Sequence, residues 1–437
     1  MLNRVPVEVW TLICRALPSA GARAAFCGVS QFCNTVCTPV LYSTICITGE
    51  RKLTLLCNTL SEREDLIPTI RALELDASDS WSEDPSAPWE IDGALMERFR
   101  PALASCINLE VLEISGQEHE APWQFCVLFE PITPTLNFPS LRHLSLQFYF
   151  NDNVYTFVQR HYHQLSSLTI EHQSDLRDAS GDMAWTANFR ENHSMPMPPS
   201  CTRLRCSPTL APVFVPGSYL TRVWMSWNAM SNLNEFDRLA PDLVTAMTKA
   251  RSPIVDLSYV GRSWNLRFMS LVAQELPALE SLYIGNNTES WPAAPNALDV
   301  ETFITPFLRE MPNILRHFKS LKILLVHSVE FEQDEDEPFR TFDGDFRTMQ
   351  QWATLCPTLL YCTLPLTHTN WTRHPSYSFF VPDIFAKNHF PSAYTTQWMH
   401  GVFAREGDEF ATSFIRQFID IRNAGIPDMV DKWMRSG

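Results

Sequence analysis

The sequence lacks the short motifs by which many enzymes hold nucleotides, nucleophiles or metals. It contains no glycine-rich phosphate loop, no nucleophile elbow and no paired cysteine or histidine spacing of a zinc site. His161 and His163 flank a tyrosine, but residues two apart on a helix point apart, so a metal would need a third ligand such as His172. No catalytic residue, metal site or cofactor is therefore predicted, and an enzyme on an α/β scaffold is the least favoured alternative.

An excess of positive charge is also absent. The 437 residues include 34 Lys and Arg against 49 Asp and Glu, which gives a formal net charge of −15. Such a chain is repelled by phosphate backbones and by anionic lipid headgroups. The composition predicts neither a nucleic acid nor a membrane as partner.

Long hydrophobic runs are missing too. No run reaches the ~18 apolar residues that span a bilayer, and Glu8 and Arg15 divide the apolar opening stretch Val5–Pro18 into pieces too short for a signal peptide. The twelve cysteines are interpreted as small buried residues of a reducing compartment. These features predict a cytoplasmic or nuclear protein.

The first forty residues predict three short helices and a further turn. Pro6 suits the start of the first helix, Ser19 can cap a second helix over Ala22–Phe26, and Thr38-Pro39 is expected to stop the third. The apolar stripe of the first helix follows steps of three and four residues and consists of Val9, Trp10, Ile13 and Leu17. Because so small a unit is only marginally stable alone, its apolar face must be buried by the rest of the chain or by a partner.

These residues resemble the F-box, particularly its form in fungal proteins. The matching stretches are VPVEVWTLICRALP and VSQFCNTVCTPVLYSTI, although Val5 stands where leucine is usual and the second helix lacks the customary leucines. The resemblance covers about a tenth of the chain. It implies a Skp-type adaptor as partner, bound through Val5, Pro6, Val9, Ile13, Leu17, Val29 and Leu41. An ordinary helical cap on a repeat array is the alternative.

After residue 50 the pattern apolar-x-x-apolar-x-apolar recurs at irregular intervals. The hexads begin at Ile70, Leu109, Leu141, Leu165, Cys201, Leu220, Ile254, Leu279, Leu321 and Leu359. Each hexad predicts a short strand whose side chains alternate between two faces. Helical stretches that end at Pro277, Pro312 and Pro357 lie between them, which predicts parallel strands with helices outside.

The fold predicted is α/β: a three-helix F-box at 1–48, an irregular leucine-rich-repeat-like solenoid at 49–375 and a C-terminal helical cap at 376–437. The cap is predicted from stripes at Phe410–Ile421 and at Met429, Val430 and Trp433. The combination resembles F-box proteins that carry such a solenoid. A compact α/β domain with unrelated strands is the alternative.

The strand positions between buried residues are expected on the concave face of the solenoid. Those proposed to bind a protein substrate are His143, Thr169, Arg203, Arg205, Arg222, Trp224, Asp256 and Tyr283. Their arginines suggest an acidic or phosphorylated substrate. The resemblance therefore implies a substrate-recognition subunit of a Skp–cullin–F-box ubiquitin ligase that is itself non-catalytic; the alternative is a scaffold protein acting outside a ligase.

Overall fold

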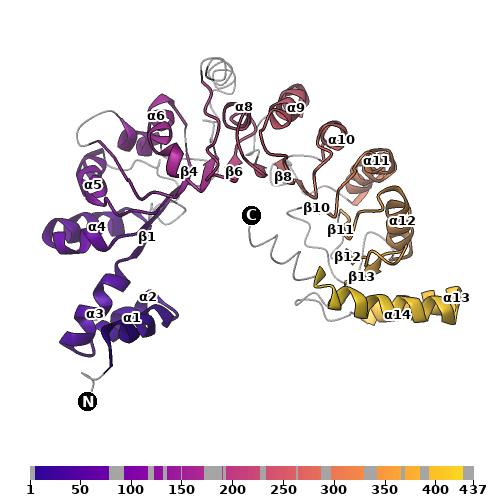
Figure 1. Ribbon diagram of the computed structural model, residues 1–437, viewed down its shortest axis with the longest axis horizontal. Helices are drawn as coiled ribbons and strands as arrows, with labels where there is room; N and C mark the ends of the chain where they lie inside the picture. The colour runs from indigo at the N-terminus through magenta and orange to yellow at the C-terminus, as the bar shows by residue number, and fades with distance from the viewer. Residues whose placement is uncertain are drawn as a thin grey trace. The chain divides into compact units, whose positions relative to one another are not determined.

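The computed structural model forms two compact units, each described by itself (Figure 1). Unit 1 comprises residues 1–191 and 197–205, and unit 2 comprises residues 192–196 and 206–437. The residues that the structure describes are 5–77, 93–116, 123–130, 135–148, 150–171, 189, 193–226, 233–261, 264–286, 297–328, 342–365, 370–383 and 393–426. The predicted boundaries at residues 48 and 375 stay predictions.

Unit 1 begins with a head of three helices, which we call the helical head: α1 (Val7–Ala16), α2 (Ala20–Cys27) and α3 (Gln31–Leu41). Pro6 is the N-cap residue of α1, and the Ser19 side chain accepts a hydrogen bond from the Ala22 N–H at 3.1 Å, as predicted for the start of α2. Ser30 caps α3 in the same way through the Cys33 N–H at 3.1 Å. Short sequence signals thus account for all three helix starts.

The helical head has a small core of its own. Buried Cys14, Val36, Cys37 and Val40 form it, and partly buried aromatic side chains pack against them. Trp10 lies between two of these, with ring centroids 6.1 Å from both Phe26 and Phe32. Aromatic pairs at this separation are favourable, so Trp10 holds the first helix against the other two.

The predicted end of the third helix at Thr38-Pro39 is wrong. Helix α3 continues through Pro39 to Leu41, and the Tyr42 N–H still donates to the Thr38 carbonyl at 3.0 Å. Thr38 does not cap a new turn, because its hydroxyl donates to the Asn34 side chain at 2.7 Å. A proline near the end of a helix removes one hydrogen bond without preventing a last turn, so the helix ends three residues later than the sequence suggested.

The rest of unit 1 alternates strands and helices. Parallel strands follow one another in chain order: β1 (Thr44–Thr48), β2 (Ala72–Ala77), β3 (Val111–Gly116), β4 (His143–Gln147) and β5 (Ser167–Glu171). The helical segments between them are α4 (Glu50–Glu62), η2 (Glu64–Thr69), α5 (Gly93–Ser105), η4 (Trp123–Phe129), α6 (Asp152–His161) and η5 (Tyr162–Gln164). Figure 1 shows the α-helices on one side of these strands.

Strand β6 (Arg203–Cys206) ends in the first residue of the second part of unit 2, which repeats the same order of elements. Its parallel strands are β7 (Arg222–Ser226), β8 (Asp256–Gly261), β9 (Ser281–Asn286), β10 (Ile323–Ser328) and β11 (Tyr361–Thr363). The helices are α8 (Ala211–Phe214), α9 (Leu233–Thr248), α10 (Leu266–Glu275), α11 (Ala297–Leu315) and α12 (Phe342–Leu355). Again the helices lie on one side of the strands (Figure 1).

The strand predictions are confirmed for all ten hexads, each of which forms a strand from its third residue onward. The first apolar residue of the hexad is buried in each case, as at Leu109, Leu220 and Leu279. The prediction that Pro312 ends a helix is wrong, because α11 runs through Pro306 and Pro312 to Leu315. Chain order, parallel pairing and one-sided helices make both units mixed α/β repeat structures of the solenoid kind.

The end of unit 2 departs from the parallel pattern. Strands β12 (Asn370–Thr372) and β13 (Val381–Pro382) are antiparallel and were not expected from the sequence. Two helices follow, α13 (Ala393–Glu406) and α14 (Asp408–Asn423). Helix α14 buries Phe414, Phe418 and Ile421 of the stripe predicted at Phe410–Ile421, whereas Ile415, also assigned to that stripe, is exposed. A cluster of aromatic rings joins these elements: Phe342, Phe346, Trp371, Phe379, Trp398, Phe403, Phe410, Phe414 and Phe418. The stripe at Met429, Val430 and Trp433 lies outside the described residues.

Candidate protein-interaction surfaces

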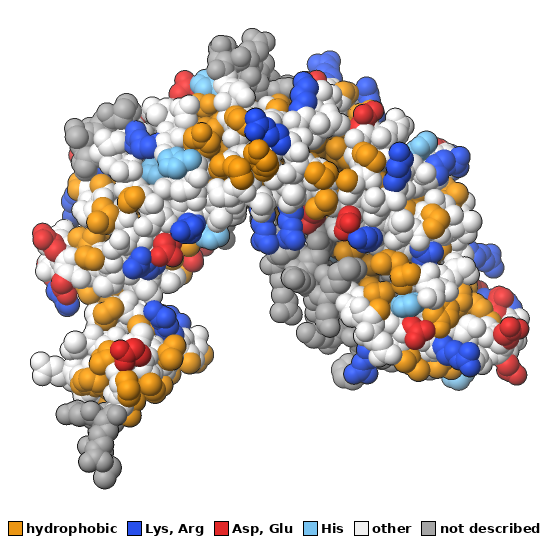
Figure 2. Space-filling view, viewed as in Figure 1, with side chains coloured by type: hydrophobic (Ala, Val, Ile, Leu, Met, Phe, Trp, Pro, Cys, Tyr) orange, Lys and Arg blue, Asp and Glu red, His pale blue; other side chains and the backbone are white. Residues whose placement is uncertain are grey.

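The helical head exposes several large apolar side chains, of which Val9, Leu12 and Ile13 share one face of α1. Six apolar side chains on and beside α1 and α2 are between 38% and 67% exposed: Val5, Val7, Val9, Leu12, Ile13 and Val29. Exposed large hydrophobic side chains are normal singly, but a cluster of them marks an interaction site. Figure 2 shows hydrophobic side chains gathered on the surface of this part of the chain.

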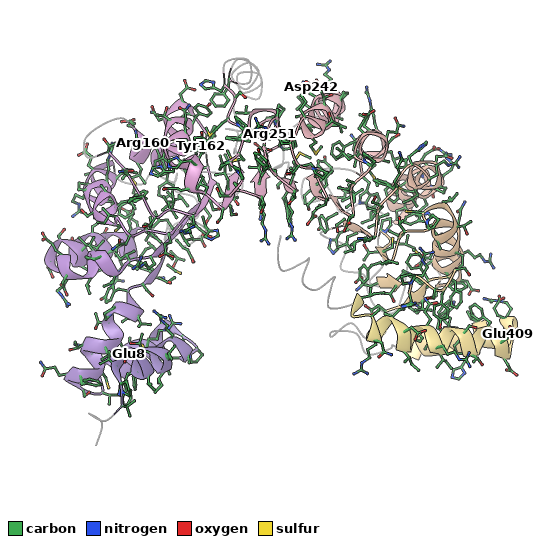
Figure 3. The ribbon with its side chains drawn as sticks, viewed as in Figure 1. Glu8, Arg160, Tyr162, Asp242, Arg251 and Glu409 are labelled. Carbon is green, nitrogen blue, oxygen red and sulfur yellow. The ribbon has the colours of Figure 1, made fainter. Side chains whose placement is uncertain are left out.

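The arrangement follows from the periodicity of α1. Trp10 and Cys14 lie four residues apart and face the core of the helical head, while Val9 and Ile13, also four apart, face solvent at 41% exposure each. Glu8 in the first turn and Arg15 in the last turn complement the helix dipole, and Figure 3 labels Glu8 on this helix. The ten residues of α1 therefore form one face that packs on the core of the helical head and another that is exposed to solvent.

The other predicted adaptor-binding residues have mixed exposure. Pro6 is exposed, whereas Leu17 and Leu41 are half-buried. The sequence analysis missed Val7 and Leu12, which are 51% and 61% exposed. Leu12 lies three residues after Val9, so the helical period that selected Val9 and Ile13 contained the signal for it.

In both units the strands present a second surface, the non-helical face, on the side away from the helices. Side chains alternate along each strand, so predicted substrate-binding positions such as Thr169 and Trp224 lie between buried residues, Leu168 and Ile170 or Val223 and Met225. In unit 1, His143 and Arg203 are exposed, and Thr169 and Arg205 are half-buried.

The non-helical face of unit 1 is acidic near its first strands. Glu74 and Glu113 are direct neighbours in the register of β2 and β3, and the Cys46 thiol donates to the Glu74 carboxylate at 2.9 Å. Burial and the nearby Glu74 raise the pKa of Glu113, and burial together with Glu74 raises the pKa of Cys46 to about 11. Glu113 is one of the strand positions that the sequence places between buried residues, but Glu74 was not singled out and their proximity was not predicted, because it depends on the strand register.

In unit 2 the structure brings four predicted residues together in two pairs. Arg222 and Asp256 are neighbours in the register of β7 and β8, and their charged groups are 3.8 Å apart. The rings of Trp224 and Tyr283 have centroids 5.9 Å apart. The expected positive charge at Arg222 is thus accompanied by a carboxylate, and an aromatic surface lies beside it.

His161 is structural in this fold. It is 1% exposed, and its Nε2 accepts from the Phe138 N–H at 3.0 Å while Nδ1 lies 2.9 Å from the Phe157 carbonyl oxygen. The described residues contain no group of three or more His, Cys, Asp or Glu side chains that could hold a metal ion. No helix in the described part of the chain is both long and apolar enough to cross a bilayer.

Comparison with known proteins adds little. No protein-family model and no curated protein matches the chain. Among solved structures, the chain is similar to one in the "Crystal structure of Rad7 and Elc1 complex in yeast", with a TM-score of 0.30 and 11% sequence identity over 82% of this chain and 87% of that chain. A TM-score this low supports no argument about fold or function, so the repeat architecture is established by the strands and helices themselves.

Proposed function

We propose that this protein is the substrate-recognition subunit of a Skp–cullin–F-box ubiquitin ligase. The helical head binds a Skp-type adaptor, and the repeat units hold a protein substrate close to the ubiquitin-charged enzyme of the complex. The chain itself carries no catalytic step in this proposal; it accelerates transfer by raising the effective concentration of the substrate. The cullin-based assembly acts in the cytoplasm or the nucleus.

One observation carries the proposal. The outward face of α1 presents Val9, Leu12 and Ile13 to solvent, although the rest of the helical head is packed around its own core. Had this face been covered by the following strands and helices, the resemblance to the F-box would have had no functional consequence. An exposed apolar face on a marginally stable unit supports a protein partner that covers it.

The adaptor interaction is tested with the full chain and a recombinant Skp-type adaptor. Ile13→Asp places a charge in the apolar face, and burying an unpaired charge is costly, so we expect capture of the adaptor to fall by at least about tenfold. Ile415→Asp is the matched control, because Ile415 is an exposed isoleucine on α14, at 54% against 41% for Ile13. Equal capture by the two variants would contradict the proposal.

Affinity capture of the tagged full chain from a cell extract that contains adaptor and cullin separates a ligase subunit from a scaffold protein. If the chain and adaptor also retain a cullin, the complex is a ligase assembly. If the adaptor binds without a cullin, the alternative of a scaffold acting outside a ligase is favoured. Each outcome is read directly from the proteins that co-purify with the unsubstituted chain and are lost with Ile13→Asp.

A further inference from the structure

The non-helical face of unit 2 contains a row of side chains set by strand register. Trp224 on β7, Ser258 on β8, Tyr283 on β9 and Leu325 on β10 are consecutive partners in the parallel sheet. Because neighbouring strands lie about 4.8 Å apart, the backbones of Trp224 and Tyr283 are roughly 10 Å apart with Ser258 between them. These four side chains therefore lie side by side across the strands.

The two large rings close over the small residue between them. Their centroids are 5.9 Å apart, which is much less than the backbone separation. Ser258 is 3% exposed, and within the described part of the chain its hydroxyl has no hydrogen-bond partner. Desolvating a hydroxyl without a partner costs stability.

A glycine on β9 makes room for the ring of Tyr283 beside the next strand, β10. Gly285 lies between Val260 and His327 in the register, and a Cβ atom there would lie 3.0 Å from Cε1 of Tyr283. The missing side chain leaves room for the tyrosine ring, whose centroid is 6.4 Å from that of the exposed His327. We call Trp224, Tyr283 and His327 the aromatic row; His327 directly follows its hexad, a signal that sequence analysis overlooked.

Within unit 2, the charged pair beside the aromatic row carries no net charge. Arg222 and Asp256, at one end of the row, lie 3.8 Å from each other and offset each other's charge. At the other end Tyr283 packs on an apolar cluster of Ile323, Leu325 and Tyr361. The phenol of Tyr283 is protonated at neutral pH, and burial raises its pKa further. A densely charged occupant would lose hydration here without gaining a counter-charge.

We propose that the aromatic row binds an uncharged, proline-containing extended segment of a protein. Such segments adopt polyproline II geometry, leave their carbonyl groups free for donors, and dock on aromatic-lined surfaces. Recognition by strand pairing is not available at this place, because β8 and β9 are each paired with a neighbour on both sides. The role of this segment as a substrate rests on the proposed function, whereas its binding does not.

The test measures binding of labelled peptides to the full chain by fluorescence anisotropy. Four peptides about 12 residues long are compared: proline-leucine, glycine-serine, aspartate-rich and arginine-rich. We expect the proline-leucine peptide to bind best, and Trp224→Ala or Tyr283→Ala to weaken it by at least about tenfold. Tyr162→Ala is the matched control, because Tyr162 is a half-buried tyrosine on the helix side of unit 1 (Figure 3).

Two more variants keep the test independent of folding. Tyr283→Phe retains the ring and should lose less binding than Tyr283→Ala. Gly285→Ala places a Cβ atom 3.0 Å from both the Tyr283 ring and Cγ2 of Val260, so it should shift these side chains and weaken binding. Preference for the aspartate-rich or arginine-rich peptide, equal binding of the glycine-serine peptide, or insensitivity to Trp224→Ala would overturn the inference. Adaptor capture with the same preparations tests the proposed function separately, so either can fail without the other.

Discussion

The guanidinium of Arg373 is held by the carbonyl oxygen of Leu359, with Nε and one terminal nitrogen at 3.0 and 2.7 Å. The same side chain donates to the carbonyls of Ala353, at 3.4 Å, and Pro357, and lies over the ring of Phe380. It is only 4% exposed. One arginine after β12 therefore satisfies carbonyl groups at and beyond the end of α12 that would otherwise be buried without donors.

Replacement of this arginine should be strongly destabilising. Arg373→Met keeps much of the volume but leaves several buried carbonyl groups unpaired, so we expect a loss of about 2–4 kcal/mol in the free energy of unfolding. Urea denaturation followed by circular dichroism measures it. Arg316→Met is the control, because Arg316 is exposed and donates to the exposed Asn313 side chain; a similar loss in both variants would contradict this explanation.

His161 should make unit 1 less stable in mild acid. Burial lowers the pKa of His161 in the folded chain below the value of about 6.5 expected when unfolded. The contribution of His161 to the free energy of unfolding is therefore complete above about pH 6.5. It declines as the pH falls toward the pKa of the folded chain, because protonation removes the acceptor for the Phe138 N–H. His161→Gln retains an acceptor that does not titrate and should flatten this dependence.

Thermal unfolding at pH 7.5 and 5.5 provides the measurement. The difference between the unfolding temperatures at these two pH values should shrink in His161→Gln and stay unchanged in His163→Gln, since His163 is exposed. If both variants respond to acid like the unsubstituted chain, other groups determine the acid sensitivity of unit 1.

Cys46 should react slowly with alkylating agents although it is exposed. Its pKa of about 11 leaves roughly one thiolate in a thousand at pH 8. Although the residue is exposed, partial desolvation of the thiol is the first cause of the raised pKa and the hydrogen-bonded Glu74 carboxylate the second, so Glu74→Gln should lower the pKa and speed alkylation by iodoacetamide several-fold. Mass spectrometry of the peptide that contains Cys46 gives the rate; an unchanged rate in Glu74→Gln would show that burial alone controls it.

Different residues of the helical head should control its stability and its binding to the adaptor. Leu12→Ser changes an exposed side chain and should alter stability by less than about 0.5 kcal/mol while weakening adaptor binding. Trp10→Ala removes the ring between Phe26 and Phe32 and should cost about 2–4 kcal/mol. Hydrogen exchange of residues 7–41 distinguishes the two, because only Trp10→Ala should remove amide protection from all three helices.

Much of the repeat architecture could be predicted from the sequence. Period-two alternation in hexads such as LRHLSL and LESLYI predicted the strands, because burial on the helix side requires the apolar residues to recur at that spacing. Strand β1 was missed because Thr44–Thr48 was assigned to the end of the F-box. Strands β12 and β13 were missed because segments of two or three residues are too short to show an alternation of apolar and polar side chains. Proline was overinterpreted at Pro39 and Pro312, where tertiary packing keeps the helix intact.

The surfaces were less predictable than the strands. Positions such as Trp224 and Tyr283 were selected individually, but they lie 59 residues apart in the sequence (283 − 224) and meet only through the strand register. The same is true of Glu74 and Glu113. Insertions of irregular length separate the hexads, so sequence spacing contains no information about which side chains become neighbours across strands. The open face of α1 was more accessible to prediction, since it depends on one helical period.

Strands β12 and β13 limit how this array can change its length. β12 reverses the chain direction, and β13 has two residues, one of them Pro382, which offers no N–H to another strand. A duplicated helix–strand unit added beyond this hairpin would find no parallel edge to join, whereas one inserted before β11 would. The parallel stretch can therefore accept a further unit without loss of strand pairing, whereas the hairpin and its aromatic cluster close this end of the sheet.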